Sequence, residues 1–204
     1  MKKNNLTKRK QRAMKALLID TTSQDLLVVL VDGESAYSVL KSVGLKGHST
    51  ILMPVIDELL RENGVKIDDI DTVGVVVGPG SFTGIRIGVA TATSLAFSLN
   101  ARRIAVTSFE MLAYSRQKAM VAVDAGHGNL YVADCEDGKV QSTRFIDGEE
   151  AKQIDKSAFE FKPAQDPAVT LERVARDKAA NGEFVQVFEP YYMRKSQAER
   201  EKGL

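Results

Sequence analysis

The stretch VGVVVGPGSFTGIRIGVATATSLAFSL, residues 73–99, decides how this chain folds. Its opening apolar run of β-branched residues is typical of a buried strand. The turn GPGS at 78–81 follows, and a segment rich in alanine and glycine continues as a predicted helix from Ser81 to Leu99. Glycine-rich turns between a strand and a helix often bind phosphate, so the first question is whether this one does.

Familiar phosphate and nucleophile motifs do not fit this turn. A P-loop requires a lysine after its last glycine, and none is present here. In the dinucleotide-binding pattern the third glycine stands one position earlier than Gly84. A nucleophile elbow requires one residue between glycine and serine, whereas Gly80 directly precedes Ser81. A Ser-His-acid triad would have only His48 and His127 to use. Phosphate binding stays physically possible, but no motif selects it.

A structural role suits the turn better. Gly78 and Gly80 allow a sharp exit from the strand, Pro79 fixes φ, and the hydroxyl of Ser81 can cap the new helix. The turn is therefore predicted to aim the helix that follows it.

The helix after the turn carries a stripe of very small residues. Gly84, Gly88, Ala92 and Ala96 recur every four residues. Glycine inside a helix costs about 0.8–1 kcal/mol relative to alanine, so close approach of another backbone is expected to offset that cost. The spacing alone favours packing within the protein, on its own sheet or first helix. Docking on a partner helix is the alternative.

Composition and charge indicate an ordinary globular protein. The 204 residues are 44% hydrophobic and 27% charged, with a formal net charge of +1. Six of the 28 basic residues and no acidic residue lie in segment 1–13, so the remaining chain carries 22 basic against 27 acidic groups. That balance does not favour a nucleic-acid surface. Segment 1–13 is predicted to be a disordered basic extension. The single cysteine and the lack of a membrane-length apolar run predict a cytoplasmic protein.

Two hairpins 104 residues apart read alike. ALLIDTTSQDLLVVLVDGE begins at Ala16 and MVAVDAGHGNLYVADCEDGK at Met120, and each first strand ends in aspartate, at Asp20 and Asp124. An Asp-Gly turn closes each second strand, which is a strong hairpin signal. The repeat predicts an α/β protein of two related lobes, 14–106 and 107–204, the second of them reduced.

Capping signals place further elements. A first helix is predicted within HSTILMPVIDELLRENG, residues 48–64, with Ser49 or Thr50 as the cap of its start and Asn63-Gly64 at its end. Thr107 and Glu110 form a capping box that opens a short helix. The run EFVQVF at 183–188 is predicted to be a strand.

The block GPGSFTGIRIG, residues 78–88, resembles the hallmark of the TsaB (YeaZ) family. That family belongs to the bacterial machinery that makes N6-threonylcarbamoyladenosine at position 37 of tRNA. Further blocks resemble the family in the same order along most of the chain from Met14. They are ALLIDTT, HSTILMPVIDELL, VTSFEMLA, VAVDAGHGNLYVA and EPYYMRKSQAE.

The resemblance implies the two-lobed actin/hexokinase/Hsp70-like (ASKHA) fold. It implies pairing with the catalytic subunit TsaD through the first two helices, a possible homodimer through the same helices, and recruitment of the ATPase TsaE. Given the resemblance, the small-residue stripe is expected to contact a helix of the partner. The residues then expected at that interface are Leu52, Ile56, Leu59, Gly84, Gly88 and Ala92.

The chain departs from the family pattern in the second lobe. Gly126 and Asn129 stand where the family usually has an arginine and an acidic residue, and segment 147–165 looks shortened. These departures put any charge contact at the second hairpin in doubt.

A non-catalytic subunit is the first functional hypothesis. The catalytic relative carries a His-x-x-x-His metal pair, whereas His48 is followed four residues later by Leu52. No metal site and no intrinsic cofactor are therefore expected, and ATP or ADP with Mg²⁺ is left for the interface with the partner. Contact with tRNA is expected only through the partner.

Two enzyme hypotheses stay open beside it. A small-molecule kinase of the same fold would use Asp20 and Asp124 across the cleft. A peptidase would use Ser81, Thr83 or Cys135 as its nucleophile.

Overall fold

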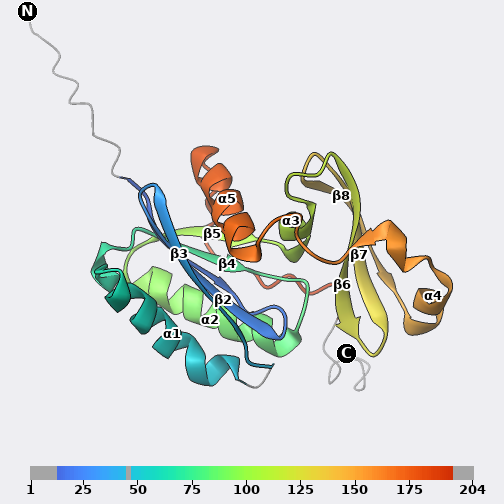
Figure 1. Cartoon of the computed structure of the whole chain (residues 1–204), viewed down its shortest axis with the longest axis horizontal. Helices are drawn as coiled ribbons and strands as arrows, with labels where there is room; N and C mark the ends of the chain where they lie inside the picture. The colour runs from blue at the N-terminus through green and yellow to red at the C-terminus, as the bar shows by residue number, and fades with distance from the viewer. Residues whose placement is uncertain (1–12, 45–46, 195–204) are drawn as a thin grey trace, which may run out of the picture.

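The computed structural model describes residues 13–44 and 47–194, and the described chain forms two β-sheets with helices packed on them (Figure 1). The predicted extension 1–13 lies outside the described residues except for Ala13. Within the described ranges, no helix combines the length and the apolar character that crossing a membrane requires.

The first sheet has the strand order β3-β2-β1-β4-β5. The β1–β2 and β2–β3 pairs are antiparallel, as the hairpin signals predict, whereas β4 runs parallel to β1 and β5 parallel to β4. Its strands are β1 (Lys15–Asp20), β2 (Asp25–Asp32), β3 (Ser35–Ser42), β4 (Thr72–Val76) and β5 (Arg102–Val106). The helices of this part are α1 (His48–Glu62), the short 3₁₀ helix η1 (Ile67–Asp69) and α2 (Phe82–Ser98).

Helices cover both faces of the first sheet (Figure 1). On one face α1 and α2 pack side by side, and the apolar residues of both helices join those of the strands in one core cluster. The opposite face is covered by α5 (Pro167–Ala180), whose Leu171, Val174 and Ala175 lie against β1 and β2 residues. The inner strands β1 and β4 are therefore buried on both faces, which explains their continuous apolar sequences.

The second sheet repeats the first in shortened form, with the strand order β8-β7-β6-β9. An antiparallel meander of three strands is again followed by a strand parallel to the first of them, but that strand has only two residues. The strands are β6 (Lys118–Gly126), β7 (Asn129–Glu136), β8 (Lys139–Ile146) and β9 (Phe159–Glu160). The helices are α3 (Ser108–Ala113), α4 (Gly148–Gln153) and the 3₁₀ helix η2 (Lys156–Ala158).

The end of the described chain returns to the first sheet. After α5, the amide of Val185 donates to Arg103 of β5, and the amide of Tyr191 donates to Val77 just after β4. We call residues 183–194 the C-terminal strap. The predicted division at residue 107 thus separates the two sheets, whereas α5 and much of the strap pack on the first of them.

Two local predictions are wrong. Helix α1 begins at His48 after Gly47, without a side-chain cap from Ser49 or Thr50. The run 183–188 forms no strand, because only its Val185 amide is paired to the sheet edge. The capping box of Thr107 and the Ser81 cap are confirmed.

Candidate functional site

The glycine turn packs against the turn between β1 and β2. The amide of Ser81 donates to the carbonyl oxygen of Thr22 at 2.7 Å, and a Cβ atom added at Gly80 would lie 2.5 Å from the same oxygen. Gly78 has φ of +111°, a left-handed conformation that favours glycine. The prediction that these residues form a structural turn has this physical basis.

The small-residue stripe of α2 meets the same β1–β2 turn. A Cβ atom at Gly84 would collide with the carbonyl oxygen of Thr21, and one at Gly88 would collide with the Thr21 hydroxyl. That hydroxyl donates to the Gly84 carbonyl at 2.7 Å. The stripe therefore serves close packing inside the lobe, which the spacing alone had favoured.

The six residues expected at the partner interface lie in the core of this chain. All of them are buried in its own core, none more than 3% exposed among those with side chains, because they face the sheet and the β1–β2 turn. The six residues are Leu52, Ile56, Leu59, Gly84, Gly88 and Ala92.

The opposite side of the two helices is exposed and, on α2, almost uncharged. Phe97 is 80% exposed and Met53 of α1 is 50% exposed. Arg86 is the only charged residue of α2. We call this surface the α1–α2 outer face. Its exposed residues are Met53, Asp57 and Arg61 of α1 with Ala90, Thr93, Ser94 and Phe97 of α2. Sequence reasoning missed Phe97, although its position opposite the stripe, among alanine, threonine and serine, was a usable signal.

A cleft of about 1580 Å³ separates the two lobes. Asp20, which ends β1, and Asp124, two residues before the end of β6, both line it, as do Ser81 and Thr83. The structure thus brings the two predicted aspartates to one cavity.

Three backbone amides at the first-lobe side of this cleft are already engaged. The Thr22 amide and hydroxyl donate to Oδ1 of Asp20, at 2.8 and 2.7 Å. The Ser81 amide donates to Thr22, and the Gly84 amide donates to the Ser81 hydroxyl. Binding phosphate here requires free N–H groups, and these three amides are occupied.

Asp20 is held as a turn residue by its hydrogen bonds to Thr22. Burial raises the pKa of its carboxyl group, against the opposing effects of the Thr22 hydrogen bonds and of His48 nearby. His48 itself is fully buried at the start of α1, and neither of its ring nitrogens has a hydrogen-bond partner among the described residues.

The second-lobe hairpin repeats the bond from aspartate to the amide two residues on and adds a bridge to α4. Oδ1 of Asp124 accepts from the Gly126 amide, and the Asn129 side chain joins the Gly126 carbonyl to the Gly148 amide at the start of α4. Asn129, one of the departures from the family pattern, thereby fixes the hairpin to its neighbouring helix.

Cys135 makes a poor nucleophile. It is buried in β7, and burial together with the neighbouring Asp134 raises the pKa of its thiol. Within the described residues, no group of three or more His, Cys, Asp or Glu side chains is arranged to hold a metal ion.

Comparison with known proteins gives a consistent result. The family model for TsaD, tRNA N6-adenosine threonylcarbamoyltransferase, matches residues 42–193. A tRNA threonylcarbamoyladenosine biosynthesis protein TsaB from Bacillus subtilis is 37% identical over 100 residues, 49% of this chain and 44% of that protein. The TsaB of Haemophilus influenzae is 28% identical over 133 residues, 62% of this chain and 56% of that protein. The matches therefore span about half the length of these curated relatives.

The fold matches a solved structure over most of the chain. YeaZ from Pseudomonas aeruginosa aligns with a TM-score of 0.74 at 23% identity, covering 88% of this chain and all of that one. With the repeated meander and parallel strand, this likeness confirms the ASKHA-like fold that the hairpin duplication and the family resemblance predicted.

Proposed function

The chain belongs to the TsaB (YeaZ) family of tRNA threonylcarbamoyladenosine biosynthesis proteins, and from this premise we propose that it is a non-catalytic subunit of that machinery. Its partner would be a TsaD-like catalytic subunit that forms N6-threonylcarbamoyladenosine at position 37 of tRNA. The pair would work in the cytoplasm, recruit a TsaE-like ATPase and contact tRNA through the catalytic subunit.

The α1–α2 outer face carries this proposal. A surface helix normally presents several charged residues to water, whereas α2 presents one arginine, Arg86, with alanine, serine, threonine and an 80% exposed phenylalanine. On α2, depletion of charge together with an exposed aromatic residue is typical of an interface core. Two helices of a partner laid on α1 and α2 would bury Phe97 and Met53 together. A second copy of the chain would use the same face.

The engaged amides support a non-catalytic role. The amides of Thr22, Ser81 and Gly84 are engaged by Asp20, Thr22 and the Ser81 hydroxyl, so these three amides are not free to bind a nucleotide phosphate. Leu52, one helical turn after His48, is buried and apolar. Any ATP or ADP with Mg²⁺ would then depend on groups that the catalytic subunit supplies.

The kinase hypothesis has one observation in its favour, which is that Asp20 and Asp124 line the same cleft. Asp20 is occupied by Thr22, and its raised pKa opposes the charged form that a Mg²⁺ ligand requires. The subunit role accounts for more of the described features.

The test is Phe97→Asp, with Val140→Asp on β8 of the second lobe as the matched control. Both place a carboxylate where an exposed apolar side chain stood, so both variants should fold. Phe97→Asp should weaken binding to the TsaD-like subunit about tenfold or more, ~1.4 kcal/mol, whereas Val140→Asp should bind as wild type. Size-exclusion chromatography and titration calorimetry measure both. Unchanged binding by folded Phe97→Asp would contradict the proposed interface.

A further inference from the structure

The inner strands of the two lobes differ at one edge. In the first sheet, β1 is paired with β2 on one side and with β4 on the other, where the register runs from Ala16↔Thr72 to Ile19↔Val75. In the second sheet, β6 is paired with β7 as far as Gly126, but β9 pairs only with Met120 and Val121. Among the described residues, no strand lies beside β6 on that edge beyond Val121.

This unpaired edge lies in the cleft between the lobes. Val123, Asp124 and Ala125 all line the cleft, and we call them the β6 edge. After β9 the chain leaves the sheet through Phe161 and Pro163, which also line the cleft, and continues to α5 on the first sheet. The shortening of the parallel strand therefore leaves an open space where β4 stands in the first lobe.

We propose that the β6 edge binds an extended segment of a partner protein, which pairs with it as an added strand. An unpaired strand edge presents alternating N–H and C=O groups, and an extended peptide satisfies both kinds at once. About four residues, roughly 13 Å of extended chain, match the length from Val121 to Ala125.

The lining of the cleft sets the composition of that segment. Buried or partly buried apolar side chains of Met111, Leu112 and Tyr191 offer contacts to an apolar centre. Three carboxylates, of Asp20, Asp25 and Asp124, line the cleft against the two cationic side chains of Lys162 and Arg194.

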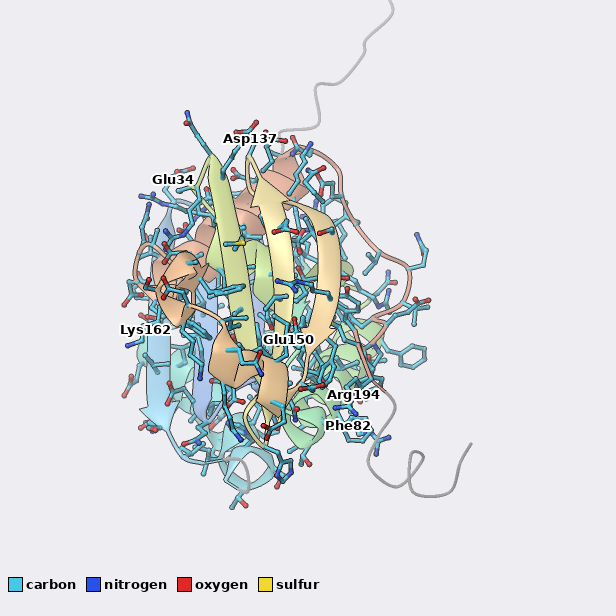
Figure 2. The ribbon with its side chains drawn as sticks, turned by 90° about the vertical axis from the view of Figure 1, so that its right-hand side faces the viewer. Glu34, Phe82, Asp137, Glu150, Lys162 and Arg194 are labelled. Carbon is cyan, nitrogen blue, oxygen red and sulfur yellow. The ribbon has the colours of Figure 1, made fainter. Side chains whose placement is uncertain are left out.

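The three carboxylates outnumber the two cationic side chains of the cleft lining by one. Figure 2 shows Lys162 and Arg194 on opposite sides of the second sheet, and the Arg194 guanidinium is engaged over the Phe145 ring at 4.0 Å. We therefore assign the occupant as an apolar extended segment flanked by basic residues.

The experiment uses the full chain and a peptide that copies the sequence of β4, because β4 fills the equivalent place in the first lobe. The labelled peptide KKTVGVVVKK carries the sequence of residues 72–77 between lysines. Fluorescence anisotropy should show saturable binding with a dissociation constant on the order of 10–100 µM. The same peptide with alternate backbone amides methylated should bind about tenfold more weakly, since it keeps every side chain and loses its donors. A glutamate-flanked peptide should also bind about tenfold more weakly.

Amide hydrogen exchange and a variant pair locate the site. Peptide should slow exchange at Val123 to Ala125, and Asp124→Asn should weaken binding while Asp134→Asn, on β7 outside the cleft, should not. Asparagine keeps the acceptor for the Gly126 amide, so the hairpin should stay folded. Equal binding of the methylated peptide, protection confined to the exposed edge of β3, or no binding up to about 1 mM would each overturn the proposal.

Discussion

The two lobes use the same hairpin for opposite purposes. In the first lobe the turn after β1 is closed, because Thr21 and Thr22 lie against the glycines of α2 and bond to Gly84 and Ser81. In the second lobe the turn after β6 is open, and a Cβ atom at Gly126 would meet nothing within 4 Å. Both hairpins line the cleft, but only the first is also packed closely against a long helix.

The difference follows from what each lobe places beside its inner strand. The first lobe has a full parallel strand and a 17-residue helix after it, and this helix must approach the hairpin closely. The second lobe has a two-residue strand and short helices, so nothing of comparable length reaches its turn. The glycine-rich block is therefore needed only once in the chain.

The largest difference in stability should appear when one methyl group is added to the hairpin contact of each lobe, at Gly84 in the first and at Gly126 in the second. Gly84→Ala should lower the free energy of unfolding by about 3 kcal/mol or more, because its Cβ has only the Thr21 backbone to displace. Gly126→Ala should cost about 1–2 kcal/mol, because its positive φ is strained but the space around it is open. Urea denaturation of both variants measures the pair.

Equal costs at the two glycines would contradict the distinction between a closed and an open hairpin. A bulkier residue sharpens the test further. Gly88→Leu should prevent the first lobe from folding, because the position faces Thr21 and not a partner. A folded Gly88→Leu protein that fails only to pair would restore the interface role of the stripe.

The next effect concerns the C-terminal strap, which touches both lobes. The Tyr192 ring lies 4.7 Å from the Phe82 ring at the start of α2, and the Arg86 guanidinium lies 4.0 Å from the Phe82 centroid. Arg194 reaches Phe145 of the second lobe, and Figure 2 shows Phe82 and Arg194 at the same end of the molecule. Tyr192→Ala should cost about 1–2 kcal/mol and Arg194→Ala about 0.5–1 kcal/mol. Thermal melting measures the stability of both variants. If Arg194→Ala lost more stability than Tyr192→Ala, the main contact of the C-terminal strap would be the one with the second lobe.

Much of the first lobe could be predicted from sequence because its signals are local. Hairpin turns, the Ser81 cap and the Thr107 capping box each depend on residues within a few positions of one another. The small-residue stripe of α2 was also visible in the sequence. The segment that packs on it is the turn at Thr21, which precedes Gly84 by 63 residues. Helical periodicity shows which face of a helix is packed closely but does not identify the distant segment that packs there.

The second lobe was harder for the same reason. Nothing local to residues 167–180 indicates that this helix returns to the first sheet, since an amphipathic helix packs equally well on either. The run 183–188 has strand-like composition, yet it lies across a sheet edge with one paired amide. The two cleft aspartates were found because the duplication itself placed them at equivalent strand ends.

The smallest effect concerns those two aspartates. Burial raises the pKa of Asp20 in the folded protein, so the folded state holds a proton more tightly than the unfolded state. Stability that depends on this group is therefore fully present below its unfolded pKa and decreases as the pH rises through the folded value. At pH 7 the charged, desolvated carboxylate should destabilise the first lobe.

Asp20→Asn should accordingly raise the free energy of unfolding at pH 7, because the amide oxygen still accepts from Thr22 and no charge is desolvated. The gain should be smaller than the loss in Gly84→Ala and should vanish below the unfolded pKa of aspartate, where both side chains are neutral. Asp124→Asn, at the equivalent exposed position of the second lobe, should change stability little at either pH. Urea titrations of the three proteins at pH 7 and at about pH 3 measure this. A loss of stability in Asp20→Asn at pH 7 would mean that the Asp20 charge has a stabilising partner, and the closed hairpin would then be an electrostatic and not only a steric construction.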